Sequence, residues 1–479
     1  GLLYLYNVKF KNIIVFISIH IYFYFIFMFS GGMCMYRSTF KGGCHPFEGK
    51  EMSSTKPVVT LEPGPELVFP LSQHAGAPAV PVVKAGDEVL AGQLIAEANG
   101  AVSANIHSSV SGKVKAIQKR PLPTGGVGMS IVITNDNEYR EVEYKPASLD
   151  SLSREEILAR IRAAGVVGMA GAGFPADAKF NPDNYDKIEN LVVNGAECEP
   201  YLTSDYKTMV DSPDRVIGGI KIALKLLPNA TAVIGIEDNK PDAVSIFREK
   251  CVNEPKIEVA KVKTKYPQGS DRMLVYSTTG KKVSPKERSS KYGVVVSNVA
   301  TLASIYDAVI EGKPSIDRIF TVSGDDIANP GNFKVRLGTP YSEVLEAAGG
   351  TIQDPEKYIN GGTMMGFAMY DLTASITKTA ASLLALKKDE VSANEPPTPC
   401  INCGSCGTVC PINLVPNKMY KLAQNGDKEG FLKIYGDYCI GCGCCSYVCP
   451  AKIPLKQGFK TMNTLIKAEN KKRRAEVKK

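Results

Sequence analysis

The sequence lacks a strong excess of either charge. In 479 residues, 57 Lys and Arg stand against 49 Asp and Glu, which gives a net charge of +8. It also lacks the interleaved basic and aromatic residues that are typical of nucleic-acid binding, so nucleic acid is not an expected partner. Hydrophobic residues make up 44% and charged residues 22%, which are ordinary values for a folded protein. The length predicts about three domains at roughly 150 residues each.

The first 33 residues lack several residue types that are common in the rest of the chain. They contain no Ala, Pro, Arg, Asp, Glu, Gln or Thr, all of which become common immediately afterwards. This composition resembles translated AT-rich upstream sequence, and it predicts that residues 1–34 are an apolar extension before a native start at Met35. The alternative is a membrane anchor, because residues 13–30 form a largely apolar and aromatic run of 18 that is long enough to cross a bilayer. Basic residues flank both of its ends, so they do not orient it.

Eight of the 13 cysteines form two copies of one spacing. The spacing C-x2-C-x2-C-x3-C-P is typical of cysteines that bind [4Fe-4S] clusters, and in two-cluster ferredoxins the fourth cysteine of each run binds the other cluster. The first predicted cluster therefore takes Cys400, Cys403, Cys406 and Cys449. The second takes Cys439, Cys442, Cys445 and Cys410.

The alternatives for these cysteines are structural zinc and disulfides. Zinc sites use two C-x2-C pairs placed well apart, and disulfide frameworks belong to short secreted chains. The cysteine content therefore predicts a reducing compartment. Cys444 is a ninth cysteine inside the second run, either a thiol beside the clusters or a small buried residue. Apolar residues at roughly helical spacing between 414 and 438 predict a helical connection.

Residues 35–140 are predicted to form a β domain. From 58 to about 133, short β-rich pieces are separated by Pro and Gly. This pattern resembles the flattened barrel of biotinyl and lipoyl carrier domains. The modifiable Lys of those carriers is missing from the corresponding turn, so we expect a structural barrel-sandwich.

Residues 151–310 alternate between helix and strand and contain a glycine-rich loop. Ser153 and Glu156 form a capping box that predicts the start of an amphipathic helix. After this helix come Gly168, Gly171 and Gly173, then Phe174 and Lys179. Glycines at this spacing allow backbone N–H groups to approach a phosphate, which Lys179 could neutralise. The alternative is that these glycines serve only tight helix–strand packing.

Three apolar strand-like runs in the same region end in polar residues. The first run leads to Asn194, Glu197 and Glu199, and the last run leads to Asn298 and Thr301. Open α/β sheets bind their ligands at the carboxyl ends of their strands. These side chains are therefore candidate ligand-binding residues at one edge of a sheet.

These motifs together resemble two related families. The loop G-x-x-G-x-G-F-P, the segment N-G-A-E-C-E-P and the segment S-N-V-A-T-L are similar to the FMN- and NADH-binding domain of the flavoprotein subunit of respiratory complex I. The order of barrel, flavin domain and twin ferredoxin runs resembles the RnfC subunits of the Rnf complexes more closely. The resemblance covers Met35 to about Lys460.

The resemblance implies a role for each candidate residue of the flavin domain. The FMN phosphate would be bound by Gly168, Gly171, Gly173 and Lys179. The ribityl chain or the ring edge would be bound by Asn194, Glu197, Asn298 and Thr301, and the nicotinamide nucleotide by Phe174 and Glu199. Met169 and Ala170 depart from the Arg and Gly of the complex I loop, which predicts a different or weaker phosphate site.

The remaining segments complete the predicted organisation. Residues 316–355 resemble the small β-grasp domain that follows the flavin domain in the same families. Residues 360–395 are predicted to be a packed helix, over 364–386, and a Pro-containing linker. Residues 396–460 form the two-[4Fe-4S] ferredoxin domain, and 461–479 form a basic tail. The fold class is thus a multidomain α/β and β protein.

The implied function is electron transfer. A flavin exchanges a hydride with NADH and exchanges single electrons with iron–sulfur clusters. The Rnf resemblance implies one subunit of a ferredoxin:NAD+ oxidoreductase that is coupled to Na+ or H+ translocation, on the cytoplasmic face of the membrane. Its partners would be the membrane and ferredoxin-like subunits of that complex. The alternatives are a cobalamin reductase of similar modular design and a noncatalytic iron–sulfur relay or docking protein.

Overall fold

The computed structural model describes residues 38–387 and 396–476. The predicted extension over 1–34, with its possible membrane anchor, lies outside the described residues, as does most of the predicted linker. Among the residues that are described, no helix combines the length and the apolar character needed to cross a bilayer.

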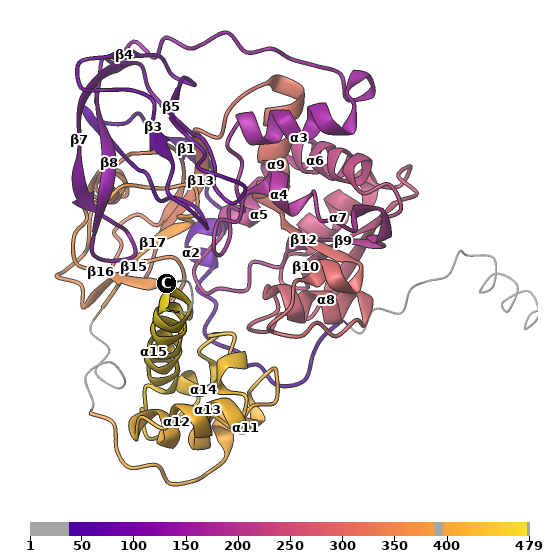
Figure 1. Cartoon of the computed structure of the whole chain (residues 1–479), viewed down its shortest axis with the longest axis vertical. Coiled ribbons are helices and arrows are strands. Elements are labelled where there is room, and N and C mark those ends of the chain that lie inside the picture. Colours follow the sequence, from indigo (N-terminus) through magenta and orange to yellow (C-terminus); the bar gives the residue numbers. More distant parts are fainter. Residues whose placement is uncertain (1–37, 388–395, 477–479) are drawn as a thin grey trace, which may run out of the picture. The chain divides into compact units, whose positions relative to one another are not determined.

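The flavin domain is built on a parallel four-stranded sheet of order β11-β10-β9-β12 (Figure 1). Its strands are β9 (Asn190–Gly195), β10 (Thr231–Glu237), β11 (Ile257–Val262) and β12 (Val294–Asn298). Its helices are α3 (Arg154–Ala163), α4 (Ala176–Lys179), α5 (Ser204–Asp211), α6 (Pro213–Leu226), α7 (Pro241–Lys250), α8 (Asp271–Thr279) and α9 (Val299–Tyr306). Short helical turns are η1 (Leu149–Ser151), η2 (Tyr185–Lys187), η3 (Ser289–Tyr292) and η4 (Asp307–Glu311).

Both faces of this sheet are buried, as the unbroken apolar runs of its strands require. Leu191 and Val193 of β9 pack in the large core formed with α3, α6, α7 and α9. Val192, which points to the opposite face, packs against Leu274 and Val275 of α8. The predicted capping box is confirmed, because the Ser153 hydroxyl and the Glu156 carboxylate exchange hydrogen bonds with each other's backbone at the start of α3.

The barrel-sandwich domain consists of two small antiparallel sheets of order β2-β8-β7-β4 and β3-β5-β6. The first contains β2 (Glu66–Pro70), β4 (Glu88–Val89), β7 (Gly112–Pro121) and β8 (Val127–Asn135). The second contains β3 (Val80–Pro81), β5 (Leu94–Glu97) and β6 (Ile106–His107). Apolar side chains from both sheets form one shared core.

The β-grasp sheet reaches beyond the range predicted for it. Its six strands have the order β1-β14-β13-β17-β15-β16. They are β1 (Val58–Thr60), β13 (Asp317–Ser323), β14 (Gly331–Arg336), β15 (Lys357–Asn360), β16 (Phe367–Met369) and β17 (Ser382–Leu386), and α10 (Tyr341–Ala347) packs on them. The sheet therefore continues past residue 355 to Leu386, and its edge strand β1 comes from the segment assigned to the barrel.

The prediction of a packed helix over 364–386 is wrong. The structure has β16 and β17 there, joined by an irregular loop. β17 lies inside the sheet, parallel to β13 and antiparallel to β15. Its apolar run Leu383–Leu386 is only four residues long, which is too short to distinguish a buried strand from part of a helix by pattern.

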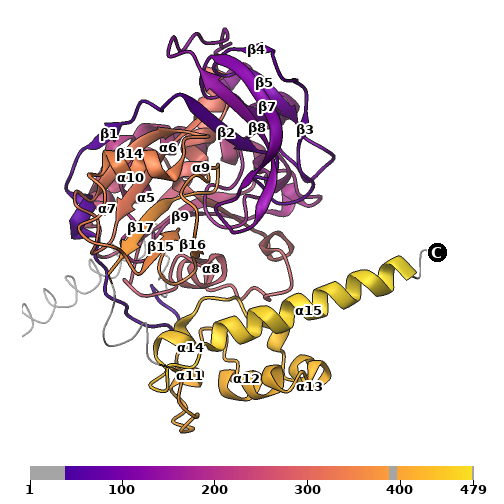
Figure 2. The same cartoon turned by 90° about the vertical axis from the view of Figure 1, so that its left-hand side faces the viewer.

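The ferredoxin domain is helical, as predicted from the 414–438 segment. It contains α11 (Ser405–Thr408), α12 (Pro416–Gln424), α13 (Lys428–Lys433), η5 (Gly436–Tyr438), α14 (Cys444–Tyr447) and α15 (Leu455–Glu476). Figure 2 shows the long helix α15 beside α12 and α14, with which it makes contact. The predicted basic tail thus forms the end of α15, as far as residue 476.

A short N-terminal segment over 40–46, here called the strap, joins the flavin and ferredoxin domains. Cys44 and Tyr266 exchange two backbone hydrogen bonds of 2.9 Å, and the N–H of Gly43 donates to the Val409 carbonyl at 2.8 Å. A side chain at Gly42 would meet the Cys410 carbonyl oxygen at 2.9 Å, so the close approach needs glycine. The strap then continues to α2 (Glu51–Ser54).

Candidate functional site

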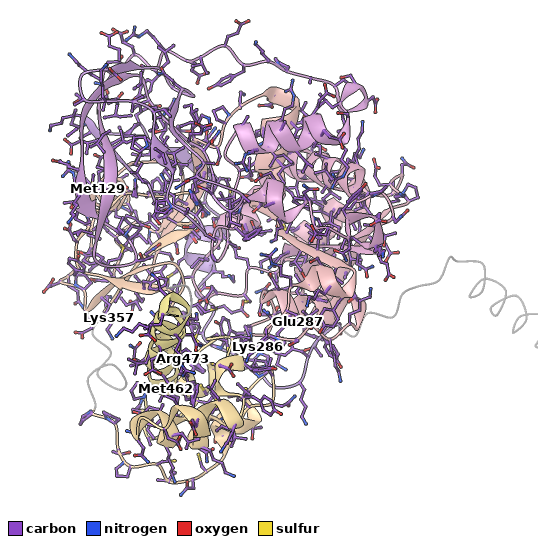
Figure 3. The ribbon with its side chains drawn as sticks, viewed as in Figure 1. Met129, Lys286, Glu287, Lys357, Met462 and Arg473 are labelled. Atoms are coloured by element: carbon purple, nitrogen blue, oxygen red, sulfur yellow. The ribbon has the colours of Figure 1, made fainter. Side chains whose placement is uncertain are left out.

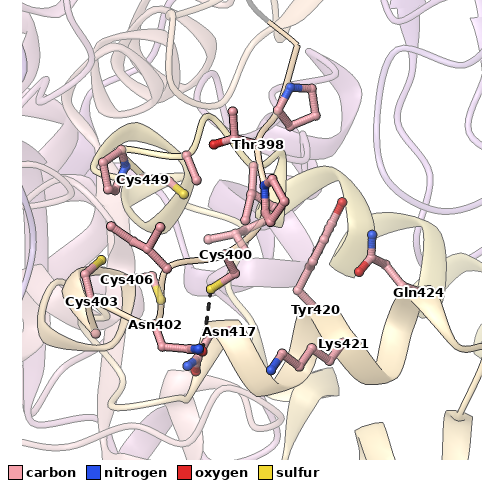
Figure 4. Close-up of a pocket in the computed structure, with 18 residues that line it drawn as sticks. Thr398, Cys400, Asn402, Cys403, Cys406, Asn417, Tyr420, Lys421, Gln424 and Cys449 are labelled. Atoms are coloured by element: carbon pink, nitrogen blue, oxygen red, sulfur yellow. Dashed lines mark hydrogen bonds between the residues drawn. The ribbon is translucent and has the colours of Figure 1, made fainter.

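The first cysteine set surrounds a cavity of about 430 Å³. Its four members are Cys400, Cys403, Cys406 and Cys449 (Figure 4). Cys400 and Cys403 lie in the loop before α11, Cys406 lies within α11, and Cys449 follows α14. The structure therefore brings together the crossed set that the sequence predicts. Cys400 and Cys403 are exposed, so this cavity lies at the surface.

The second set lines a separate and much smaller cavity of about 20 Å³. Its members are Cys410, Cys439, Cys442 and Cys445. Cys444 lines it as well, and apolar side chains such as Met419 and Phe459 close it. This cavity is enclosed more tightly than the first, and burial raises the pKa of Cys439 to about 11 and that of Cys445 to about 12.

Both donor sets fit iron–sulfur clusters. Each set offers four thiols, and the described residues around its cavity include no competing carboxylate or imidazole. Within the described residues, no group of three or more His, Cys, Asp or Glu side chains is arranged to hold a single metal ion. The cysteines are instead spread around a cavity, as a four-iron cubane requires. Because thiolates are the ligands and burial favours the neutral thiol, the metal itself must deprotonate the buried ones.

The glycine-rich loop runs from Gly168 to the start of α4. Gly168 donates its N–H to the Phe174 carbonyl at 2.9 Å, which closes the loop. Gly171 has a φ of +77°, and no atom of the described residues lies within 4 Å of the place where its Cβ would stand. Gly173 has a φ of +66°, but its missing Cβ would lie 2.6 Å from the Thr379 methyl carbon. Gly171 therefore leaves open space above the loop, whereas Gly173 serves packing.

Hydrogen bonds from α9, from β13 and from the barrel domain hold this loop in place. The N–H of Met169 donates to the hydroxyl oxygen of Thr301 at 2.9 Å. The buried guanidinium of Arg318, in β13, reaches the Met169 carbonyl at 3.4 and 3.5 Å. The N–H of Ala75, in the barrel domain, donates to the Gly173 carbonyl at 3.0 Å. The predicted site residue Thr301 thus positions the loop from α9.

The predicted polar edge of the sheet is present. Asn194 of β9 and Asn298 of β12 are direct partners in the parallel register. Asn298 caps α9 and donates from its amide to Asp205 at 2.6 Å. Glu197 accepts hydrogen bonds from the N–H groups of Asp205 and Tyr206 at 2.7 and 3.2 Å, at the start of α5. Burial and then the charge of Glu197 raise the pKa of Asp205 to about 7.

The polar groups of these edge residues mostly form hydrogen bonds with other groups of the protein. The Asn194 amide donates to the Gly269 carbonyl at 2.8 Å, and its oxygen accepts from Ala196 at 3.2 Å. The partly buried Lys50 donates to the carbonyls of Glu197 and Glu199 at 2.8 and 2.9 Å. Hydrogen bonds within the protein therefore already fix the side chains at this edge. Contacts between these side chains and a flavin stay a prediction.

A large cavity beside the sheet has a volume of about 630 Å³. It lies along the edge strand β12, between the segment 174–184 and the loop 283–291. Of the predicted residues, Phe174 and Lys179 line it. The Arg288 guanidinium stacks over the Phe174 ring at 5.2 Å, and Arg272 adds another cation to the wall. Its size suits a nucleotide, and its cations suit phosphate.

Two buried polar side chains near the sheet edge have no partner in the described part of the chain. Both amide atoms of Gln268 and the hydroxyl of Ser297 are unpaired, and Gln268 is completely buried. Unpaired buried groups of this kind cost free energy unless something bound there completes their hydrogen bonds. Together with the open space at Gly171, they fit a bound flavin, whose ring edge carries donors and acceptors.

Glu199 lies at the junction with the ferredoxin domain. Its carboxylate accepts hydrogen bonds from the Tyr266 hydroxyl and from the Met364 N–H, both at 3.1 Å, and burial raises its pKa. The same Tyr266 hydroxyl lies 2.9 Å from the Cys442 carbonyl. The structure thus places Glu199 next to the second cysteine set, while Phe174 lines the large cavity.

A second contact joins the same two domains. Lys286, labelled in Figure 3 beside Glu287, forms an ion pair with Asp437 of the ferredoxin domain. Lys286 also lies over the Tyr438 ring, just before Cys439. The loop that borders the large cavity therefore also contacts the second cysteine run.

Sequence reasoning missed several residues of this region. Gln268 lies in the short motif Y-P-Q-G over 266–269, and Arg272 follows it three residues later; the pattern alone gives neither residue a role. No sequence motif around Arg318 or Lys378 indicated that either residue would lie near the site. Lys378 is fully buried, and it donates to the carbonyls of Asn105 and Gly165 at 2.6 Å each, just before the glycine-rich loop.

Comparison with protein families divides the chain into four matched domains. Residues 38–138 match the RnfC barrel sandwich hybrid domain, and 161–307 match the Nuo51 FMN-binding domain. Residues 319–368 match the SLBB domain, and 399–453 match the 4Fe-4S dicluster domain. The predicted fold class is confirmed.

Curated relatives match most of this chain. The C subunit of the proton-translocating ferredoxin:NAD(+) oxidoreductase complex of Clostridium ljungdahlii is 43% identical over 81% of this chain and 84% of its own length. The C subunit of the Na(+)-translocating complex of Acetobacterium woodii is 38% identical over 82% and 89%. The C subunit of the ion-translocating oxidoreductase complex of Pseudomonas aeruginosa is 39% identical over 82% of this chain and 51% of its own. Among solved structures, a NAD+-reducing [NiFe]-hydrogenase matches 69% of this chain and 60% of its own at 16% identity and a TM-score of 0.43.

Proposed function

The chain belongs to the family of RnfC subunits of ion-translocating ferredoxin:NAD+ oxidoreductase complexes, and on that premise we propose that it transfers electrons between NAD(H) and iron–sulfur centres. The observation that carries this proposal is the junction at Tyr266. One hydroxyl links Glu199 of the flavin domain to the backbone of Cys442, a predicted cluster ligand. An FMN-binding domain and a two-cluster domain are thereby held in direct contact within one chain.

The chain's own residues would bind and orient the nucleotides. The open backbone at Gly171 and the cations Lys179 and Arg288 would receive phosphate groups, since guanidinium, ammonium and backbone N–H groups all donate to phosphate oxygens. Phe174 would stack against a planar ring. Gln268 would pair with the polar edge of the flavin. A flavin bound here would accept a hydride as two electrons and release them singly.

The two cysteine sets have different surroundings, which supports an order for electron transfer. The set of Cys439, Cys442, Cys445 and Cys410 contacts the strap and the flavin domain. The set of Cys400, Cys403, Cys406 and Cys449 is partly exposed, and the residues that line its cavity all belong to the segment 397–455 of the ferredoxin domain. We assign the enclosed set as the inner centre and the exposed set as the exit toward another protein.

The position of the protein in the cell follows from its family. Family members belong to membrane-associated complexes of several subunits, so this chain is part of such a complex too. We further propose that it docks at the cytoplasmic face, where NADH is available, and passes electrons to membrane and ferredoxin-like subunits. Ion translocation, of Na+ or H+, would then belong to those subunits.

Anaerobic purification tests the proposal. The protein, loaded with iron and sulfide, should retain FMN and two [4Fe-4S] clusters, and stepwise addition of NADH should bleach first the flavin and then cluster absorption. A protein that holds both clusters but no flavin would favour the noncatalytic relay. A protein whose bound flavin NADH does not reduce would contradict the assigned activity.

A further inference from the structure

Two buried cysteines outside the predicted ligand sets meet at the junction between the strap and the ferredoxin domain. Cys44 lies on the strap, and Cys444 begins α14, far away in sequence. They pack with Tyr266 and Cys442 in one small cluster of buried side chains. Cys444 is fully buried, and Cys44 is 6% exposed. Neither sulfur is needed to complete either set of four.

The Cys444 thiol has three neighbours with which it can share its proton. Its side chain packs with those of Cys44 and Cys442 in this buried cluster, and its sulfur lies 3.9 Å from the Tyr266 carbonyl oxygen. Cys442 is a predicted ligand of the inner cluster. The Cys444 thiol also lines the cavity of that cluster. It therefore stands beside the ligand sulfur without competing for the ligand position.

The backbone around these thiols is fixed from both sides. The strap pairs with Tyr266 through two hydrogen bonds at Cys44, while the Tyr266 hydroxyl lies 2.9 Å from the Cys442 carbonyl. Cys44 therefore cannot drift away from Cys444 without breaking contacts to the flavin domain. Because both thiols are buried, solvent does not readily replace a lost donor.

We propose that Cys444, positioned by Cys44, donates an S–H hydrogen bond to the Cys442 sulfur and thereby raises the reduction potential of the inner cluster. This inference rests on the proposed function, because it requires a cluster bound to the second cysteine set. Hydrogen bonds to cluster sulfurs are among the factors that set cluster potentials. A donor stabilises the more negative, reduced cluster more than the oxidised one, so it favours reduction.

The test is a potentiometric titration, followed by electron paramagnetic resonance, of the full chain with both clusters loaded. Cys444→Ala should lower one of the two midpoint potentials, with about a tenfold decrease in the equilibrium constant for reduction, or about 59 mV for a one-electron couple. Cys44→Ala should lower the same potential by less. Cys444→Ser keeps a donor and should restore most of the wild-type value. Cys251→Ala, at a buried cysteine after α7 in the flavin domain, is the matched control and should change neither potential.

The outcomes separate this inference from the function on which it rests. Two clusters with unchanged potentials in Cys444→Ala would overturn the inference and leave the function intact. Loss of one cluster from both Cys444→Ala and Cys444→Ser would make Cys444 a ligand, which also overturns it. A wild-type chain that binds no cluster would remove the proposed function itself.

Discussion

Replacing Gly171 by Ala tests whether the glycine-rich loop binds a phosphate. The backbone of Gly171 has a φ of +77°, which costs an L-residue about 1–2 kcal/mol. The added methyl group meets no atom of the described residues within 4 Å, so packing contributes nothing further. It would, however, occupy the space through which a phosphate approaches the loop. Loss of one hydrogen bond to a charged group costs about 1.5–3 kcal/mol, which predicts FMN binding weaker by about 10- to 100-fold.

Gly350 supplies the matched control. Its φ is +74°, and its missing Cβ would also meet no described atom within 4 Å. Gly350→Ala should therefore cost the same free energy of unfolding and leave FMN affinity unchanged. The measurement is an equilibrium titration of FMN into flavin-stripped protein, monitored by quenching of flavin fluorescence, with thermal unfolding of all three proteins alongside. Equal FMN affinities for Gly171→Ala and Gly350→Ala would refute the phosphate-loop assignment.

Three further predictions concern the same regions. Lys179→Ala should lower the flavin content of purified protein by removing a cation from the large cavity, while iron analysis should still find both clusters; joint loss of flavin and iron would contradict the domain assignment. Cys449→Ala should remove the same cluster signal as Cys400→Ala, because both side chains line one cavity, and loss of different signals would refute the crossed ligand sets. Burial lowers the pKa of Lys378 from 10.5 to about 7, so the unfolded chain binds one more proton between these values, and stability should rise with pH by up to about 1.4 kcal/mol per unit. Lys378→Met should lose this rise in chemical unfolding measured from pH 7 to 10, and an unchanged slope would show that Lys378 stays charged.

The features predicted correctly from the sequence are those encoded locally. The capping box at Ser153 and Glu156 involves neighbours in one turn, so its residues alone determine it. The strands of the parallel sheet are long apolar runs buried on both faces, which few other structures accommodate. The cysteine spacing also predicts which cysteines gather around each of the two cavities, while their role as crossed cluster ligands stays a prediction.

The features that were missed depend on contacts between distant segments. β17 is a short apolar segment of five residues with three Leu, so its pattern suits a helix equally well, and only its neighbours β13 and β15 decide for a strand. The roles of Gln268 and Arg318 arise from burial that no local pattern encodes. The contact between Cys44 and Cys444 could not be predicted either, because it forms only when the strap lies between the flavin and ferredoxin domains.

The strand β1 pairs with β14 and not with the barrel that follows it in sequence. The N-terminal segment therefore contributes first to the cysteine-rich module, then to the edge of the third domain, and only afterwards to its own. Deletion of the segment up to and including β1 would leave β14 with an unpaired edge, and such edges invite aggregation. The domains follow one another along the sequence but share this N-terminal segment in the folded protein. A chimaeric protein in which one domain is replaced must therefore keep a strap and a β1 that fit the new neighbour.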